Sequence, residues 1–379
     1  MKKVCFVADS FLADPASVIT GPQVQIYRIG KEMLQRGWEV HVVAYRTNPT
    51  LLSEPFEGLT LHWIPKRGML PLLGSFRILR RLWLIDAATY YQRGRDVLSG
   101  ILGLYCLLFD KRMVWASAGE LGVERSKYRL QTAKKKRNPF LKFLLYLEAW
   151  ANDMVCEFGI RHATFIVVQT QFQQNRLRTS FGRSSLQVGS GHSLSSETKR
   201  DDQLTVLWIG SLKPVKRPEL FLELAQRCAD LPCRFILAGQ FADLSYEYMF
   251  KKRLLASKVE YLGPIPFGQS DTLIGSAHCL VNTTEPGYEG IPNSFIQAWI
   301  HGTLTISFAA DPDELIKEQQ LGLVSCDLDE IYEFLKEISQ QSEKWYSRSV
   351  EIKQYAQSRF SIETVVNKLE PLFNASDSA

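Results

Sequence analysis

Short apolar runs alternate with segments of helical periodicity along residues 204–326. The runs are rich in Val, Ile and Leu, a pattern typical of strands buried on both faces of a parallel sheet. The predicted strands are TVLWIG (205–210), CRFILAG (233–239), VEYLG (259–263), HCLVNTT (278–284), TLTISF (303–308) and GLVSC (322–326). The predicted helices are 218–228, 246–255, 270–276 and two that begin at Asn293 and Asp313. This alternation predicts a doubly wound α/β domain of the Rossmann type.

The first half of the chain begins in the same way. A predicted strand, KVCFVAD (3–9), is followed by a loop and by a helix from about Pro22 to Arg36. Arg36 and Gly37 end that helix in the usual manner, because a cation suits the last turn and Gly suits the position after it. The further predicted strands are WEVHVVAY (38–45), LTLHWI (59–64), AATYYQ (87–92), KRMVWAS (111–117) and ATFIVVQT (163–170). We therefore expect a second Rossmann-like domain.

The length of the chain sets the number of domains. Its 379 residues exceed the roughly 250–300 at which a single hydrophobic core stops growing. A Ser- and Gly-rich stretch predicts a linker near residues 192–203. The expected parts are a domain over 1–195, a domain over 203–354, and a last helix over about 355–379 that packs back on the first domain.

Neither a targeting segment nor a membrane span is expected. The N-terminal run VCFVA stops at Asp9 without a small-residue cleavage site, and the longest apolar run, about 97–109, is shorter than the ~20 residues that cross a bilayer. Seven cysteines form no CxxC pair, which favours reduced thiols in a cytoplasmic protein. A metal site at Cys228 and Cys233 is the less favoured alternative, because no His or Cys cluster accompanies them.

Charge is distributed unevenly along the chain. Residues 1–200 carry 29 Lys and Arg against 15 Asp and Glu, whereas residues 201–379 carry 16 against 25. The basic surplus is concentrated at 66–81 and 125–142, beside aromatic and aliphatic residues. That combination is typical of segments on an anionic surface such as the inner face of the plasma membrane, and a solvated basic face is the alternative. No nucleic-acid-binding motif accompanies the charge, so no nucleic acid is expected as a partner.

Two turns of the second half carry candidate chemistry. After TVLWIG comes SLKPVKR, which places Lys213, Lys216 and Arg217 between a strand end and a helix, where amides and cations bind phosphate. A solvated basic loop is the alternative. After HCLVNTT comes EPGYEGIPNSFIQAW (285–299), in which Glu289 could accept hydrogen bonds from sugar hydroxyls. The amides of Asn293, Ser294 and Phe295 are expected to be unpaired at the start of a helix, and an exposed loop acid is the alternative for Glu289.

Together these turns resemble the donor site of family 4 of the retaining GT-B glycosyltransferases. The family's strand ends in Gly-Arg, a Lys precedes the helix, and a Glu-Gly-x-Pro loop leads to a second Glu. The counterparts here are Gly210, Ser211, Lys216, Glu289, Gly290, Ile291, Pro292 and Gln297. The resemblance extends to TGPQVQIYRIGKEMLQRGWEVHVV, YYQRG and RHATFIVVQTQFQQNRL. It implies the GT-B fold, in which an acceptor-side domain and a nucleotide-sugar-binding domain face each other across a cleft.

The resemblance also implies roles for residues. Lys216 would neutralise the diphosphate of a nucleotide-sugar, Gly21 would let the backbone approach the distal phosphate, and Glu289 would hold sugar hydroxyls. Gln297 would face the ribose. The donor-binding residues are then Gly21, Gly210, Ser211, Lys216, Arg217, Glu289, Gly290, Ile291, Pro292, Asn293, Ser294 and Gln297, and the catalytic candidates are Glu289 and Glu120.

Three residues depart from the family pattern. Ser211 replaces the usual Arg, so Lys213 or Arg217 would supply the second positive charge. Gln297 replaces a Glu, and Glu120 lies where many relatives have a His near the reacting centre. A nucleotide- or glycan-binding protein without turnover therefore stays open as an alternative, as does a sugar-nucleotide epimerase.

The function predicted by the resemblance is transfer of a hexose-type sugar to a glycan or lipid-linked acceptor, with retention of configuration, in cell-surface polysaccharide or glycolipid synthesis. No cofactor and no metal are expected, because the family's enzymes generally work without a metal. The six histidines lie in strands or beside helices and loops without the spacing of metal ligands.

Overall fold

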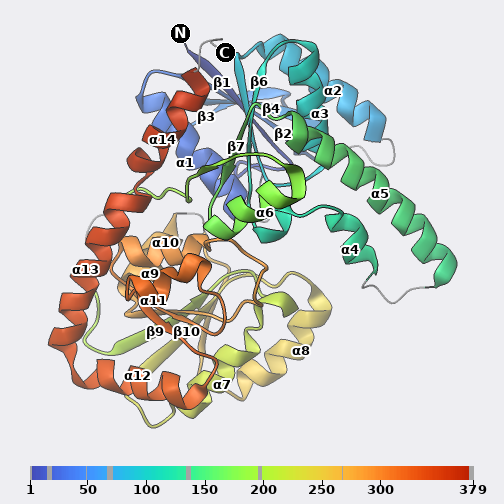
Figure 1. Ribbon diagram of the computed structural model, residues 1–379. Helices are drawn as coiled ribbons and strands as arrows, with labels where there is room; N and C mark the ends of the chain where they lie inside the picture. The colour runs from blue at the N-terminus through green and yellow to red at the C-terminus, as the bar shows by residue number, and fades with distance from the viewer. Residues whose placement is uncertain are drawn as a thin grey trace. The chain divides into compact units, whose positions relative to one another are not determined.

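The computed structural model describes residues 2–14, 19–47, 49–65, 71–133, 138–194, 199–266 and 268–374. The predicted basic segments 66–81 and 125–142 and the predicted linker therefore lie partly outside the described residues. The chain divides into two compact units. Unit 1 comprises Met1–Gly191 and Ile362–Ala379, and unit 2 comprises His192–Ser361. Each unit is described by itself (Figure 1).

The described residues of unit 1 form an eight-stranded sheet. Its strands are, in their order across the sheet, β3 (Ser53–Phe56), β4 (Leu59–Pro65), β2 (Glu39–Arg46), β1 (Lys3–Ala8), β5 (Thr89–Arg93), β6 (Arg112–Ala116), β7 (Phe165–Val168) and β8 (Leu186–Gln187). Neighbouring strands are parallel except β3 and β4, which are antiparallel. The pattern of apolar runs missed β3, because SEPF has no apolar alternation.

Helices cover both faces of this sheet. Val4 and Phe6 of β1 alternate with Cys5 and Val7, and the two pairs belong to different hydrophobic cores. The first core includes α1 (Gly21–Gln35) and α14 (Ile362–Asn374), and the second includes α2 (Pro71–Ile85), α3 (Val97–Leu108), α5 (Pro139–His162) and α6 (Gln171–Phe181). A short helix, α4 (Lys127–Ala133), and a 3₁₀ turn (Glu120–Val123) complete the unit.

The C-terminal tail consists of three helices. They are α12 (Leu328–Gln340), α13 (Ser342–Phe360) and α14 (Ile362–Asn374). The last helix begins at Ile362 rather than near residue 355, because Ser361 has extended dihedral angles that interrupt the helical run. Phe373 of α14 packs edge-on against Phe6 and Trp38 of unit 1, and Arg36 binds Glu370 at 2.9 Å. Residues 375–379 lie outside the described part.

The described residues of unit 2 form a six-stranded parallel sheet. Its strands are, in their order across the sheet, β11 (Glu260–Gly263), β10 (Cys233–Ala238), β9 (Leu204–Ile209), β12 (Cys279–Asn282), β13 (Leu304–Ser307) and β14 (Gly322–Val324). The helices that follow them are α7 (Glu219–Arg227), α8 (Leu244–Leu255), α9 (Gln269–Ser276), α10 (Asn293–Ile300) and α11 (Leu315–Glu318). The six predicted strands are confirmed. The helix predicted from Asp313 is only α11, because Asp313 and Glu314 have positive φ angles of 51° and 55°.

The order of strands in unit 2 brings two turns together. From β9 the chain adds β10 and β11 on one side, then returns to the other side with β12, β13 and β14. The carboxyl ends of β9 and β12 are therefore neighbours where the order reverses, which is where open α/β sheets bind ligands. Among the residues that the structure describes, no helix is both long and apolar enough to cross a membrane.

Candidate functional site

An ion pair joins the two predicted turns of unit 2. Lys216 lies in a 3₁₀ turn (Pro214–Lys216) after β9, and Glu289 lies in the loop after β12. The Lys216 Nζ and the Glu289 Oε1 are 2.5 Å apart, and the two side chains are 15% and 27% exposed. The two residues singled out from separate motifs, 73 positions apart, thus meet at the carboxyl edge of the sheet.

The second carboxylate oxygen of Glu289 has no partner. Its Oε2 is buried and accepts no hydrogen bond from any described residue. Buried polar atoms are nearly always paired, and an unpaired one costs about 1–3 kcal/mol. A carboxylate accepts but cannot donate, so the missing partner is a hydrogen-bond donor such as a hydroxyl.

Lys213 forms a second link between the same turns. Its Nζ lies 3.0 Å from the Tyr288 hydroxyl and 5.0 Å from the centre of the Tyr288 ring. No carboxylate in the described part of the chain lies within ion-pair distance of Lys213. The Lys213 charge is thus not neutralised, and it stands three residues before Lys216, a spacing at which side chains of a 3₁₀ turn lie on the same side.

Arg217 holds the turns together and does not offer a free cation. Its guanidinium donates to the Thr283 carbonyl oxygen at 2.8 Å and to the Thr284 carbonyl oxygen at 3.2 Å. The Thr283 hydroxyl donates to the Lys216 carbonyl oxygen at 2.6 Å and accepts from the Trp208 indole at 2.9 Å. Of the two candidates for the second positive charge, Lys213 therefore fits the geometry and Arg217 has a positioning role.

Gly210 and Ser211 form the start of the turn after β9, and this start packs against the turn after β10. Leu212 forms an isolated bridge with Phe241. Gly239, which sequence reasoning missed, has φ 142°, and a Cβ there would lie 1.8 Å from the Gly210 carbonyl oxygen. The sequence feature that could have indicated this contact is that the two predicted strands, TVLWIG and CRFILAG, both end in Gly.

We expect Gly239→Ala to lower the free energy of unfolding by about 2–3 kcal/mol, because the new methyl group meets backbone and the φ angle strains an L-residue. Gly263→Ala is the matched control, since Gly263 has φ 74° but nothing within 4 Å of the added Cβ. The control should cost only about 1 kcal/mol. Urea titrations measure both variants, and equal losses would contradict the close contact with Gly210.

The Glu289 loop leads into α10 without a side-chain cap. Pro292 occupies the N-cap position, no side chain accepts a hydrogen bond there, and Ile291 is buried. Asn293 and Ser294 occupy the first two helical positions and are half-buried. The amide of Phe295 is not unpaired as predicted, because it donates to the Pro292 carbonyl oxygen at 3.0 Å.

Gln297 is engaged by its amide nitrogen. The Nε2 donates to the Asp271 Oδ1 at 2.9 Å and to the Ser270 hydroxyl at 3.3 Å. Its amide oxygen is the group left to accept from a ligand. A Glu at this position would set two carboxylates about 3 Å apart, so Gln is the residue that suits a neighbouring Asp271.

Gln297→Glu should therefore lower the free energy of unfolding by about 1–2 kcal/mol at pH 8 and by less at pH 5, where a shared proton relieves the repulsion. Chemical denaturation at both pH values measures this difference. Adding Asp271→Asn to the variant should restore most of the loss at pH 8. Equal losses at both pH values would show that repulsion is not the cause.

The remaining predicted residues lie in unit 1. Gly21 is the first residue of α1, which follows the loop after β1, and the Thr20 amide before it donates to the Gln23 side chain at 3.1 Å. Glu120 is half-buried in the 3₁₀ turn after β6. The neighbouring Ser117 hydroxyl donates to the Gly119 carbonyl oxygen at 2.9 Å.

The described cysteines and histidines form no metal-binding cluster, although His41 Nδ1 and His62 Nε2 lie 2.9 Å apart. Among the described residues, no three His, Cys, Asp or Glu side chains are placed to share a metal ion. Burial raises the pKa of Cys228 to about 12 and that of Cys233 to about 11. Both thiols are therefore protonated near neutral pH, and Cys326 is exposed.

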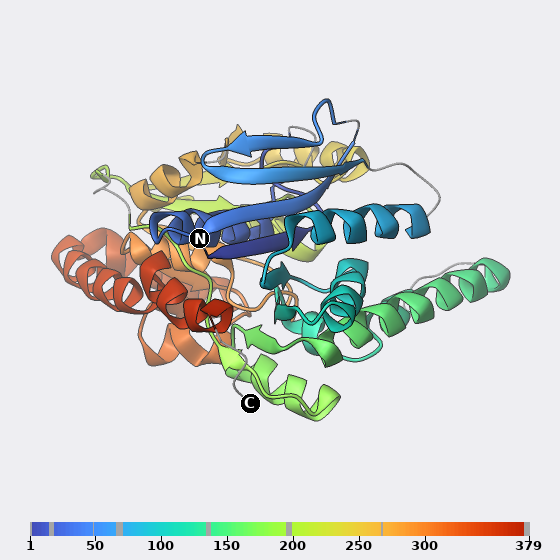
Figure 2. The same cartoon turned by 90° about the horizontal axis from the view of Figure 1, so that it is seen from above.

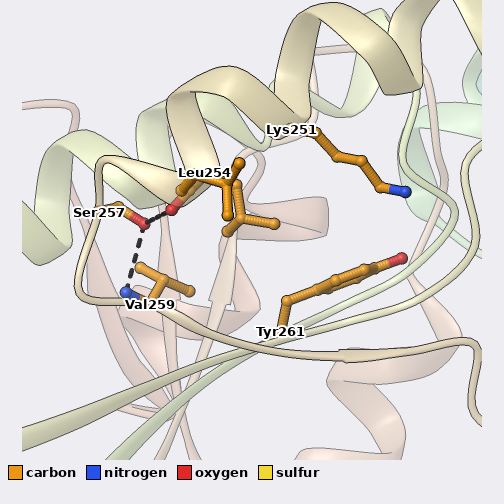
Figure 3. A pocket seen from close by; sticks show the side chains of 6 residues that line it. Lys251, Leu254, Ser257, Val259 and Tyr261 are labelled. Atoms are coloured by element: carbon orange, nitrogen blue, oxygen red, sulfur yellow. Dashed lines mark hydrogen bonds between the residues drawn. The ribbon is translucent and has the colours of Figure 1, made fainter.

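A shallow hollow of about 360 Å³ lies elsewhere on unit 2, between α8 and β11 (Figure 3). It is lined by Lys251, Leu254, Leu255, Ser257, Val259 and Tyr261. The Lys251 Nζ binds Glu247 at 2.6 Å. Because β11 is the edge strand, two strands away from β9, the hollow is separate from the Lys216–Glu289 pair.

Residues 203–341 match the model of the family Glycosyl transferases group 1. No curated protein sequence matches the chain significantly.

Solved structures of similar fold match nearly the whole chain. Anabaena Alr3699/HepE in complex with UDP and glucose has a TM-score of 0.72 at 12% identity, over 98% of both chains. WaaG, a glycosyltransferase involved in lipopolysaccharide biosynthesis, has a TM-score of 0.68 at 14% identity, over 98% of this chain and 100% of WaaG. The catalytic domain of Arabidopsis thaliana starch synthase IV bound to ADP and acarbose has a TM-score of 0.68 at 11% identity, over 98% of both chains. The chain as a whole thus has the GT-B fold, and its residues 203–341 match the family model of the glycosyl transferases group 1.

Proposed function

We propose that this protein is a glycosyltransferase that binds a nucleotide-sugar at the Lys216–Glu289 pair. The observation that carries the proposal is the buried Glu289 Oε2, which has no donor among the described residues and lies in the same pair of turns as Lys213 and Lys216. A sugar hydroxyl supplies the donor that Glu289 lacks, and a diphosphate supplies the negative charge that the two lysines bind.

The same groups account for leaving-group stabilisation. The departing diphosphate gains charge in the transition state, and Lys213 and Lys216 are already held beside its proposed position. The uncapped start of α10 adds the positive end of a helix dipole. We therefore propose that the reaction needs no bound metal, which EDTA treatment tests: transfer should change by less than about twofold.

Retention of configuration is part of the proposal, supported by the resemblance of the two turns to family 4. The proposed product has the anomeric configuration of the sugar in the donor. The coupling constant of the anomeric proton in the NMR spectrum of the product measures it. An inverted product would contradict this part of the proposal and leave the donor site untouched.

The acceptor we propose is a glycan or lipid-linked glycan of a cell-surface polysaccharide or glycolipid. Similar folds have been solved with UDP and glucose and with ADP and acarbose. A panel of UDP-, GDP-, ADP- and CMP-sugars in thermal-shift experiments identifies the base, since a ligand at ~100 times its dissociation constant stabilises by about 2.7 kcal/mol.

Nucleotide release with and without acceptor tests the activity itself. A glycosyltransferase releases nucleotide faster when a suitable acceptor is present. A binding protein without turnover would show a thermal shift and no release, and an epimerase would interconvert donors in the absence of acceptor. Either of these two results would overturn the proposed transfer.

A further inference from the structure

The helix α5 carries a stripe of large apolar side chains that face solvent. Phe140 is 73% exposed and Phe143 is 60% exposed. Leu144, Leu147, Trp150 and Met154 continue the stripe at helical spacing and are also exposed. A helix face of this kind requires a partner, because large exposed apolar patches mark interaction surfaces.

Exposed apolar residues continue onto the two other helices of the same layer. α3 exposes Leu104, Leu107 and Leu108, and α2 exposes Phe76, Trp83 and Leu84. α2 packs on α3 and α3 packs on α5, so the three helices cover one face of the unit 1 sheet. Figures 1 and 2 show all three on the same side of that sheet. The outward side chains named for α2, α3 and α5 are hereafter the apolar face.

The apolar face is rigidly attached to the unit. A Cβ on Gly159 of α5 would lie 2.0 Å from the Ser99 carbonyl oxygen, and one on Gly100 of α3 would lie 2.3 Å from the Val155 carbonyl oxygen. The two backbones therefore touch. This contact fixes the direction of α5 and therefore of the stripe that it carries.

Basic residues accompany the apolar face. Arg77 and Arg80 are exposed on α2 next to Phe76 and Trp83. Four consecutive cations, at 134–137, precede α5 in the sequence, although their positions lie outside the described residues. Within the described residues of α2, α3 and α5 the exposed acid is Glu148, and Asp86 and Asp110 are exposed where α2 and α3 end.

We propose that the apolar face lies on an anionic lipid bilayer, with its apolar side chains among the acyl chains and Arg77 and Arg80 at the phosphates. Tryptophan at 83 and 150 suits the level of the headgroups, and basic residues around an apolar stripe are what interfacial helices carry. The proposed arrangement is that of interfacial helices, which lie on the surface of one leaflet. In a cell the anionic inner leaflet of the plasma membrane offers that surface.

A second copy of the chain is the competing occupant, and charge argues against it. Two such faces would bring Arg77 and Arg80 near the same cations of another copy, whereas an anionic bilayer attracts them. This inference does not rest on the proposed transfer, because vesicle binding is measured without a sugar nucleotide.

Flotation of the full chain with vesicles tests the proposal. Vesicles of phosphatidylcholine with about 30% phosphatidylglycerol should bind at least about tenfold more protein than neutral vesicles at ~0.05 M NaCl, and about 0.5 M NaCl should remove most of that excess. Equal binding to both vesicles, or no binding to either, would overturn it.

Matched variants locate the surface. Phe143→Glu with Trp150→Glu should lower the bound-to-free ratio by about tenfold or more, and Arg77→Glu with Arg80→Glu by about tenfold. The controls are Tyr248→Glu with Met249→Glu, and Lys252→Glu, which change similarly exposed residues of α8; they should bind like wild type. If the Phe143 and Trp150 variant kept vesicle binding but turned a dimer into a monomer in light scattering, the face would bind a second copy and the proposal would be wrong.

Discussion

Lys216→Ala should lower kcat for sugar transfer by roughly 10²–10³-fold, the effect of removing one pre-positioned donor from a developing anion. The Lys216 Nζ is held in place by the Glu289 Oε1 at 2.5 Å, and the Thr283 hydroxyl fixes the Lys216 backbone by donating to its carbonyl oxygen at 2.6 Å. Its charge therefore costs no reorganisation as the diphosphate leaves. Initial rates with the best donor and acceptor measure the loss.

One further variant separates charge from shape at this site. Glu289→Gln keeps the volume but replaces the carboxylate with a neutral amide, and we expect about tenfold or more lower kcat/KM because charge-assisted hydrogen bonds to hydroxyls are roughly twice as strong as neutral ones. Lys251→Ala is the control, because Lys251 lies at the separate hollow beside Glu247. Transfer by the Lys216 variant within about threefold of wild type would mean that the assigned donor site is wrong.

Asp153→Ala should lower the free energy of unfolding of unit 1 by about 3–5 kcal/mol, the usual cost of leaving one partner of a buried ion pair alone. Asp153 of α5 and Arg95 are 1% and 0% exposed and lie 2.9 Å apart. The same carboxylate accepts from the backbone amides of Tyr128 and Arg129, at 3.0 and 3.1 Å. The substitution therefore removes the contacts that attach α4 to α5.

Hydrogen exchange followed by mass spectrometry reports this loss by segment. Peptides from α4 and α5 should exchange at least about a hundredfold faster in the Asp153 variant, whereas peptides from unit 2 should not change. Glu148→Ala, at an exposed position of the same helix, should leave exchange unchanged. Equally faster hydrogen exchange in both units, or unchanged exchange in α4 and α5, would contradict the local role of Asp153.

Several features of the site followed from local sequence alone. The six strands of unit 2 are short apolar runs, and a run that is buried on both faces has few alternatives to a parallel strand. The resemblance of the two turns to the family 4 donor site implied that Lys216 after one run and Glu289 after another belong to one site. Their pairing at 2.5 Å agrees with that expectation, and their role in donor binding stays a prediction.

Other features depended on distances that no local pattern encodes. In the sequence, Arg217 and Lys213 are equivalent cations of one turn. In the structure, Arg217 donates to the Thr283 and Thr284 carbonyl oxygens and thereby positions the turns. From the sequence, Gln297 is only a neutral replacement for the family's Glu. The structure shows that its amide nitrogen donates to the Asp271 Oδ1 at 2.9 Å, a bond that a Glu could not make. The last helix begins at Ile362 because a single residue, Ser361, leaves helical dihedral angles.

The sequence by itself determined the two α/β domains, their strands and the turns that hold Lys216 and Glu289, because burial periodicity and turn residues act over a few neighbouring positions. Only the tertiary structure decided which polar atoms stay unpaired and which apolar side chains stay exposed. The Glu289 Oε2 is unpaired and the α5 stripe is exposed because no other described part of the chain packs against them. That property belongs to the whole fold, since it depends on residues far away along the chain.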